Sequence, residues 1–167
     1  FSSNDGLNGS VIHAAYDVTV TITGSTFSNN TTRTGGFGAV ATVRYDSSLN
    51  VSNSNFTNNS SGGFGGVLYV EQGQSVNGVT NLSITDSTFE NSASTNAGGV
   101  LYIKDRVSVN ISDSNFLSNQ GANGAAIFMT SIDGTAVIQD SIFQNNSTDL
   151  SNGGEGGAIT AIGGGSS

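Results

Sequence analysis

The chain has 167 residues, including 24 glycines but no proline, tryptophan or cysteine, and only 10% of its residues are charged. The lack of cysteine excludes disulfides and thiolate metal sites, and a net charge of −8 argues against nucleic-acid or anionic-membrane partners. Hydrophobic residues make up 35% of the chain, yet no apolar run approaches the ~20 residues of a membrane-spanning helix.

Two kinds of short strand are predicted to alternate along the chain. Apolar, often β-branched positions alternate with polar ones in both, which is typical of a half-buried strand. After the opening Phe1–Asn4, the strand-bearing segments are 10–14, 20–30, 38–42, 49–59, 66–70, 82–92, 99–103, 109–119, 125–129, 136–146 and 157–161. The pattern predicts two or three short strands per repeat, and no segment shows a convincing helical period.

Each long segment contains a phenylalanine, followed three residues later by asparagine in all copies but one, where Ser92 replaces it. The phenylalanines are Phe1, Phe27, Phe56, Phe89, Phe116 and Phe143, and the asparagines are Asn4, Asn30, Asn59, Asn119 and Asn146. Successive phenylalanines lie 26, 29, 33, 27 and 27 residues apart. A period of this length indicates a solenoid, propeller or array in which each repeat packs on its neighbours.

Strands joined by bends too short for helical crossovers wind as a coil, with equivalent residues stacked about 4.8 Å apart. A β-propeller is disfavoured because each blade needs about 40–45 residues. We therefore predict an all-β fold over residues 1–167 as one domain: a right-handed single-stranded parallel β-helix of about six coils of 26–33 residues. The phenylalanines are expected to form a buried stack, and the asparagines a hydrogen-bonded structural ladder.

Two alternating motifs resemble the repeat of the chlamydial polymorphic outer-membrane protein family, which pairs Gly-Gly-Ala-(Ile/Leu/Val) with Phe-x-x-Asn. The first motif appears at Gly65–Leu68, Gly98–Leu101 and Gly156–Ile159, and the second at Phe1–Asn4, Phe27–Asn30, Phe56–Asn59, Phe116–Asn119 and Phe143–Asn146. The alternation covers the whole chain. The resemblance implies the β-helical passenger of a secreted autotransporter, with an extracellular adhesive or structural role.

The second strand of each repeat offers the best candidate for a surface contact. Its aliphatic column is expected to face inward: Ile12, Val40, Leu68, Leu101, Ile127 and Ile159. A mixed column beside it is then expected to face outward: His13, Ala41, Tyr69, Tyr102, Phe128 and Thr160. Tyr69, Tyr102 and Phe128 would form an aromatic strip suited to stacking on sugar rings or another chain. The alternative is that these rings stack on one another and stabilise the sheet.

Asp86, Asp113 and Asp140 fall in one column with Gly24 and Asn53. These residue types tolerate positive φ, so the column predicts a left-handed bend after each strand. A calcium ladder is the alternative, because hard cations bind stacked carboxylates. Glycine and asparagine in the same column favour the bend, and no metal or other cofactor is predicted.

A charged group follows the second strand in several repeats. It comprises Arg44, Asp46, Glu71, Lys104, Asp105 and Arg106. Carboxylates and bases on adjacent coils could cleave a polysaccharide, although a solvated loop face with weak ion pairs is the simpler interpretation. The lone His13 gives no support to a Ser-His-Asp triad.

Eleven Asn-x-Ser/Thr sequons occur, among them those at Asn50, Asn81 and Asn110. In a secreted eukaryotic protein they would be glycosylation sites. Most are expected from the composition of an Asn-, Ser- and Thr-rich repeat.

No capping repeat is recognisable, so we expect both ends of the helix to be open. Either the chain continues in a longer solenoid or copies self-associate end to end. The function we expect is a non-enzymatic extracellular or cell-surface module, structural or adhesive, that binds no nucleic acid and does not insert into a membrane. Its further partners would be glycans or a host surface protein. The alternatives are a carbohydrate-active β-helix enzyme and a glycan-binding, trimeric spike.

Overall fold

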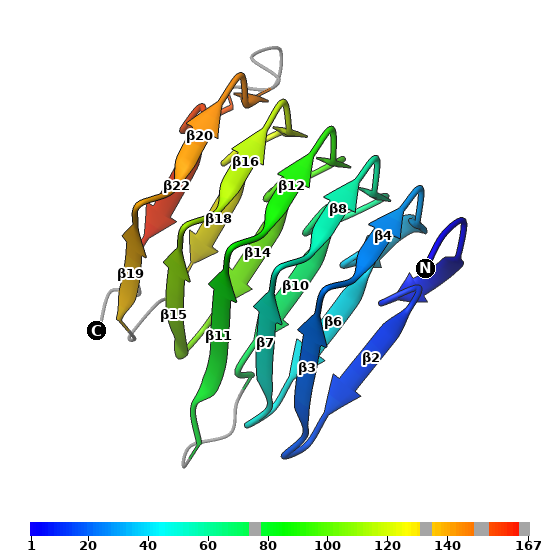
Figure 1. Cartoon of the computed structure of the whole chain (residues 1–167), viewed down its shortest axis with the longest axis vertical. Coiled ribbons are helices and arrows are strands. Elements are labelled where there is room, and N and C mark those ends of the chain that lie inside the picture. The colour runs from blue at the N-terminus through cyan, green and yellow to red at the C-terminus, as the bar shows by residue number, and fades with distance from the viewer. Residues whose placement is uncertain (74–77, 131–134, 149–153, 164–167) are drawn as a thin grey trace.

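A computed structural model of the chain describes residues 1–73, 78–130, 135–148 and 154–163. Within these ranges the regular structure consists of β-strands alone, and every strand pairing is parallel. Successive coils lie side by side along one axis, with the N-terminal coil at one end and the C-terminal coil at the other (Figure 1). The predicted all-β parallel β-helix is therefore confirmed.

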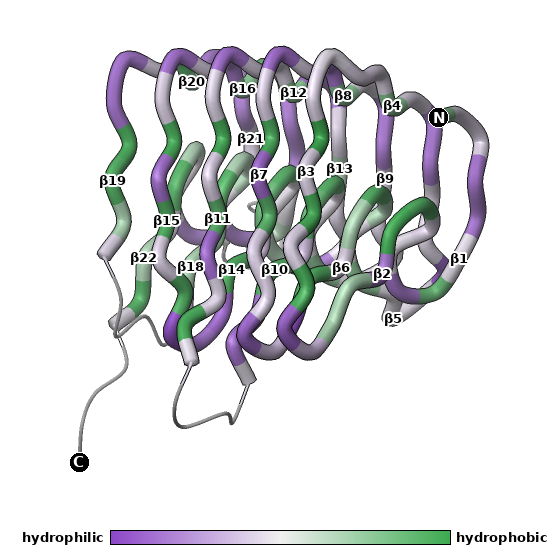
Figure 2. The backbone as a smooth tube through the Cα atoms, turned by 60° about the horizontal axis from the view of Figure 1, so that its bottom comes forward, coloured by the Kyte–Doolittle hydropathy of each residue, from purple (hydrophilic) through white to green (hydrophobic). Residues whose placement is uncertain are grey.

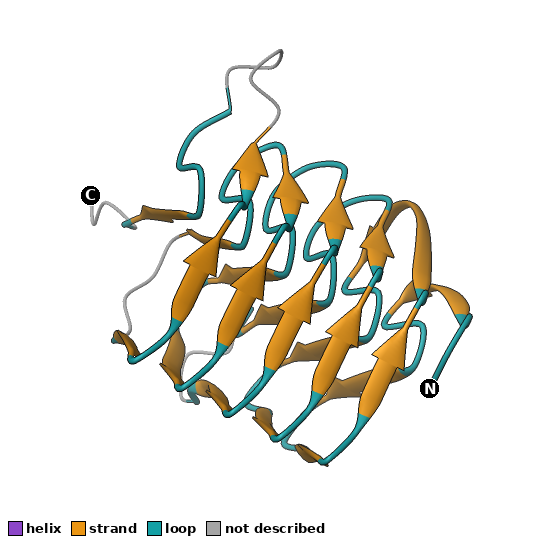
Figure 3. Cartoon of the chain, turned by 45° about the horizontal axis from the view of Figure 1, so that its top comes forward, coloured by secondary structure: helices purple, strands orange, loops and turns teal. Residues whose placement is uncertain are grey.

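Each coil contains four strands, rather than the two or three predicted, and equivalent strands form four sheets (Figure 3). Sheet 1 contains β1 (Asp5–Asn8), β5 (Thr31–Phe37), β9 (Ser60–Ser61), β13 (Ala93–Ser94), β17 (Gln120–Gly121) and β21 (Ser147–Thr148). Sheet 2 contains β2 (Ile12–Ala15), β6 (Ala41–Arg44), β10 (Leu68–Glu71), β14 (Leu101–Lys104), β18 (Ile127–Thr130) and β22 (Ile159–Ile162).

The other two sheets come from the repeated long segment, which bends in its middle and so supplies two strands. Sheet 3 contains β3 (Thr19–Thr23), β7 (Ser48–Ser52), β11 (Thr80–Thr85), β15 (Val107–Ser112) and β19 (Ala136–Gln139). Sheet 4 contains β4 (Thr26–Ser28), β8 (Asn55–Thr57), β12 (Thr88–Glu90), β16 (Asn115–Leu117) and β20 (Ile142–Gln144). Because two sheets have six strands and two have five, the chain makes about five full turns instead of six.

The core is a hydrophobic column inside the coil. Ring centroids of successive phenylalanines, from Phe1 to Phe143, are 4.6–5.0 Å apart, and their planes are within 10° of parallel. The four inner rings are at most 1% exposed. Inward aliphatic residues of sheets 2 and 3 complete the core, whereas the bend between sheets 3 and 4 is hydrophilic (Figure 2). Parallel stacking of equivalent residues therefore places each ring on its counterpart in the next coil.

The bend between sheets 3 and 4 repeats with the same geometry in each coil. Residues 24, 53, 86, 113 and 140 have φ between 47° and 56°, in the left-handed region that glycine, asparagine and aspartate tolerate best. The serine that follows each bend donates a hydrogen bond to the carbonyl two residues earlier, at 2.7–3.0 Å. Its oxygen also accepts the N–H of the equivalent serine in the preceding coil, at 3.1–3.2 Å. The serine column thus stabilises the corner and joins successive coils.

Asparagine side chains form a second ladder at the corner between sheets 4 and 1. The backbone N–H of Asn30 and its side-chain amide both donate to Oδ1 of Asn59, at 3.0 and 2.9 Å. Asn119 donates to Asn146 in the same way, at 3.0 Å in both bonds. Ser92 interrupts the ladder because its shorter side chain donates instead to the Glu90 carbonyl.

We expect Ser92→Asn to raise the free energy of unfolding by about 0.5–1.5 kcal/mol, because the longer side chain can bridge Asn59 and Asn119 and complete the ladder. Urea unfolding of the variant, with Ser92→Ala as the control that removes the hydroxyl without adding an amide, measures this. A destabilised Ser92→Asn protein would show that the corner at this coil has no room for the amide.

Candidate functional site

The candidate site lies on the outer face of sheet 2, the face opposite the phenylalanine core. Tyr69, Tyr102 and Phe128 stack there on adjacent strands, with centroids 5.3 and 5.4 Å apart. They form a hydrophobic cluster separate from the main core. The predicted aromatic strip is therefore a continuous structural feature of this face.

Its exposure, however, differs from the prediction, because a second layer covers the tyrosines. Phe37 lies 4.7 Å from the Tyr69 ring, and Phe64 lies at the same distance from the Tyr102 ring. Tyr69 is 4% exposed and Tyr102 9%. Both covering phenylalanines come from the segment before the strand, where each directly precedes a glycine with positive φ, Gly38 or Gly65. Tyr69 and Tyr102 are consequently inaccessible for stacking on a ligand, and only Phe128 is partly exposed.

The register also corrects one member of the predicted outward column. Thr42, not Ala41, pairs with Tyr69 and His13, while Ala41 pairs with Leu68 and belongs to the inner column in place of Val40. The reason is the glycine before the strand. Gly38 and Gly65 both have positive φ, so Gly38 is equivalent to the first glycine of the Gly-Gly pair rather than the second.

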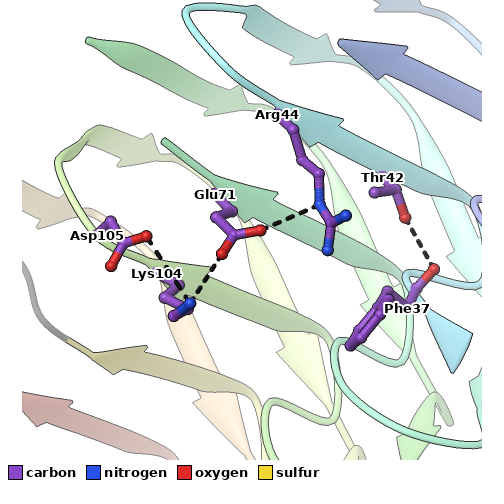
Figure 4. Close-up of polar contacts among 6 residues, drawn as sticks. All are labelled: Phe37, Thr42, Arg44, Glu71, Lys104 and Asp105. Carbon is purple, nitrogen blue, oxygen red and sulfur yellow. Dashed lines mark hydrogen bonds and ion pairs between the residues drawn. The ribbon is translucent and has the colours of Figure 1, made fainter. Parts of the chain in front are cut away.

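Four charged residues lie next to the aromatic layer on three neighbouring coils (Figure 4). Glu71 on β10 lies between two cations: its Oε1 is 2.8 Å from Lys104 Nζ on β14, and its Oε2 is 3.1 Å from Arg44 Nε on β6. Asp105 approaches the same Lys104 nitrogen at 3.9 Å. In-register pairing of Glu71 with Arg44 and Lys104 produces this arrangement.

Arg44 connects the ion pairs to the aromatic layer. Its guanidinium carbon lies 5.2 Å from the Phe37 ring centroid and 5.0 Å from that of Tyr69, which is within cation–π distance. The Nε atom is buried without a hydrogen bond, so its contact with Glu71 is electrostatic rather than a directed bond. Thr42 fixes the covering segment by donating to the Phe37 carbonyl at 2.9 Å (Figure 4).

The structure brings together only part of the charged group considered from the sequence. Glu71, Arg44, Lys104 and Asp105 form one cluster, in which each oxygen of the Glu71 carboxylate is engaged by a cation. Asp46 instead contacts the amide of Gln72, which also accepts a hydrogen bond from Thr80 at 2.6 Å. The chemistry that this geometry supports best is electrostatic cross-linking of three coils.

Burial and ion pairing raise the pKa of three side chains at this site. Burial raises the pKa of both Tyr69 and Tyr102, and the hydrogen bond to Glu71 raises the pKa of Lys104. A tyrosine in the unfolded chain titrates near pH 10, so above that pH the unfolded state loses its protons first. The stability of the folded chain therefore falls as pH rises. Lys104 also makes the folded chain less stable as pH rises. Its contribution to stability is fully present below about pH 10.5, the pKa of an unfolded lysine, and is lost as pH rises through the raised pKa of the folded state.

We expect the free energy of unfolding to decrease above about pH 10, with a slope of up to ~1.4 kcal/mol per pH unit from each buried tyrosine. The measurement is urea unfolding between about pH 8 and pH 11 for the wild type and for Tyr69→Phe. The variant should show a shallower alkaline decline, because the phenyl ring cannot ionise. Equal slopes in the two proteins would contradict a role for Tyr69 burial.

The aspartate column and His13, the other positions considered from the sequence, lie on exposed surface or near the N-terminal end of the coil. Asp86, Asp113 and Asp140 are exposed along one corner, where they adopt the left-handed bend described above. Among the residues that the structure describes, no three His, Asp or Glu side chains come close enough to hold a metal ion. His13 occupies the N-terminal end of the outward column on sheet 2, beside Thr42.

Comparison with known proteins supports the repeat in one part of the chain. Residues 53–71 match the family model of the Chlamydia polymorphic membrane protein repeat. This stretch contains one Phe-x-x-Asn motif, one Gly-Gly-Val-Leu motif and the whole of β10, ending at Glu71. The predicted resemblance is thus confirmed for one coil. No curated protein and no solved structure shows significant similarity to the chain.

Proposed function

We propose that this chain is a non-enzymatic module of a cell-surface or extracellular β-helical rod, with a structural or adhesive role. Its repeat and its β-solenoid fold suit an autotransporter-like, surface-exposed protein. Within the ranges that the structure describes, no helix is long and apolar enough to span a membrane.

The observation that carries the proposal is the engagement of the clustered charges. Glu71 forms ion pairs with Arg44 and with Lys104 across three coils, next to a covered aromatic layer. Serine and asparagine ladders run parallel to them, and together these contacts stiffen the coil along its axis. Outward positions of sheet 3 are mainly uncharged Asn, Ser and Thr. A rigid rod with polar sides presents repeated surfaces, whereas catalysis needs reactive groups available to a substrate.

Several apolar side chains of the last described coil are less buried than their counterparts in the coil before it. Phe143 and Ile138 are only half buried, whereas their counterparts Phe116 and Ile111 are fully buried. Ile142 beside them is 55% exposed. A further coil would cover these residues and pair with the free strand edges. We therefore propose that this face packs on another coil, from the same polypeptide or from a second copy.

Attachment of the folded module to a surface tests the function. Beads coated with the purified chain should bind cultured epithelial cells in a saturable manner, and soluble chain should compete. The control is beads coated with the same mass of heat-denatured chain. Binding no greater than that control would overturn the adhesive role. Release of reducing ends from polysaccharides, abolished by Lys104→Ala, would instead establish the enzymatic alternative.

A further inference from the structure

A shallow groove of about 400 Å³ crosses the outer surface of sheet 1, on a different face from the aromatic layer. It spans β5, β9, β13 and β17, so it covers three intervals between coils, or about 14 Å at the usual spacing. Its polar lining consists of Thr32, Ser60, Ser61, Ser94, Thr95 and Gln120. Small residues, Gly62 and Ala93, complete the lining.

The lining is hydroxyl- and amide-rich and contains no charged side chain. Arg33, the residue after Thr32, forms an ion pair with Asp5 at 3.2 Å. The chain as a whole carries a net charge of −8, which disfavours an anionic ligand. A neutral molecule with many hydroxyl groups is therefore the best match, because each hydroxyl can donate to and accept from such a surface.

One buried hydroxyl in the groove has no hydrogen-bond partner. Ser94 is 8% exposed, and its Oγ forms no hydrogen bond. The equivalent hydroxyl one coil earlier, on Ser61, donates to the Gly36 carbonyl at 2.9 Å and accepts from the Gly63 N–H at 3.2 Å. An unpaired buried hydroxyl costs about 1–3 kcal/mol, so a ligand that supplies the missing partner gains affinity at this point.

The next coil supplies no side-chain partner for Ser94 either. Thr32 and Ser61 continue one hydroxyl column and bond to each other at 3.0 Å. Beyond Ser94 the column reaches Gly121, which has no side chain; a Cβ there would lie 3.4 Å from Ser94 Oγ. It would also lie 2.9 Å from the Gly99 backbone nitrogen, so the tight backbone approach disfavours a side chain at this point. The fold thus leaves Ser94 unpaired at the wall of the groove.

We propose that this groove binds a short stretch of a neutral polysaccharide, lying across the coils, with one sugar hydroxyl hydrogen-bonded to Ser94. The proposal names the ligand class of the proposed adhesive module, and its biological meaning rests on that function. Without an aromatic platform in the groove, hydrogen bonds alone hold the sugar, and each site is expected to bind with a Kd on the order of 1 mM. Repeated sites on a surface would supply avidity.

Backbone amide chemical shifts measured by NMR during titration test the proposal. The probes are the neutral tetrasaccharides cellotetraose, maltotetraose and chitotetraose, and the anionic tetragalacturonate, each raised to about 20 mM, well above the expected Kd. At least one neutral probe should shift the amides of Ser61, Ser94 and Gln120 in a saturable way. Shifts elsewhere only, no saturable shift with any neutral probe, or a preference for tetragalacturonate would overturn it.

Matched variants separate recognition from folding. Ser94→Ala removes an unpaired hydroxyl, so the chain should remain folded while its affinity for the neutral probe falls about tenfold. Ser112→Ala is the control, since Ser112 is also 8% exposed but lies on β15, outside the groove. Equal affinities for the wild type and Ser94→Ala would overturn the assignment of Ser94.

The two proposals can fail separately. If the probe titrates into the groove but coated beads do not attach to cells, the adhesive function is wrong and the groove stands. If beads attach equally well with the wild type and Ser94→Ala, and no neutral probe binds, the groove is wrong and adhesion uses another surface.

Discussion

Phe89→Ala should lower the free energy of unfolding by about 3–5 kcal/mol, the largest effect expected for a single substitution in this chain. Phe89 is 0% exposed and stacks on Phe56 and Phe116 at 4.6 and 5.0 Å. Alanine would leave a cavity between two flat rings that the strands hold at a fixed spacing, so the neighbours cannot close it. Urea unfolding, followed by far-ultraviolet circular dichroism, measures the loss.

Phe64→Ala is the matched control, because it deletes the same ring from a partly exposed position over Tyr102. Phe64→Ala should lower the free energy of unfolding clearly less than Phe89→Ala does. Phe89→Leu, which keeps most of the volume, should fall between the wild type and Phe89→Ala and gives a folded variant if alanine abolishes folding. Equal losses at Phe64 and Phe89 would mean that the phenylalanine stack is not the centre of the core.

Glu71→Ala should lower the free energy of unfolding by about 2 kcal/mol or more. Removing one member of a buried ion pair leaves uncompensated charge, which costs about 3–5 kcal/mol when all partners are buried. Here the side chain of Glu71 is 11% exposed, but those of Arg44 and Lys104 are 20% and 40% exposed, so solvent reduces the loss. The measurement is again urea unfolding, at low and at about 1 M salt; the effect should persist, since buried pairs are screened weakly.

Asp5→Ala provides the comparison for this prediction. The Arg33–Asp5 pair has side chains that are 75% and 50% exposed, so breaking it should cost less than about 1 kcal/mol. A Glu71→Ala variant no less stable than Asp5→Ala would indicate that the cluster contributes only as a surface ion pair.

The fold was predictable because the same residue types recur at each coil. Parallel pairing in register makes a solenoid sequence self-similar, and the strictly placed phenylalanines, serines and asparagines identified the stacked columns. The interrupted ladder at Ser92 was equally visible. The number of strands per coil was harder to predict from the sequence. The left-handed bend at positions such as Asp86 divides one repeated segment between two sheets.

The candidate site was predicted only in part, because it depends on residues outside the repeated motifs. The stacking of Tyr69 and Tyr102 followed from their shared column, but their burial depends on Phe37 and Phe64, which belong to neither repeated motif. The one-residue shift at Ala41 arose from a single glycine, Gly38, where three other coils have two. Positive φ decides which glycine is equivalent, and a sequence does not display it.

The charged cluster could be located from the sequence, but its role could not. Arg44, Glu71 and Lys104 each end a strand of sheet 2, so an in-register parallel sheet places an acid between two bases. Residue types alone were compatible with catalysis, with solvated ion pairs or with a buried cross-link. In the structure both carboxylate oxygens of Glu71 contact a cation beside the covering aromatic layer, which is the arrangement expected of a cross-link.

The most direct test of the coiled, in-register architecture uses the absence of native cysteine. Asn50 and Ser83 are Cα partners on β7 and β11, and both face outward on sheet 3. The double variant Asn50→Cys/Ser83→Cys should form an intramolecular disulfide on mild oxidation, detected by mass spectrometry. The variant Asn50→Cys/Asn110→Cys should not, because two coil intervals separate its cysteines by about 9.6 Å, beyond disulfide reach. A disulfide in the second variant but not in the first would contradict the β-helix and its register.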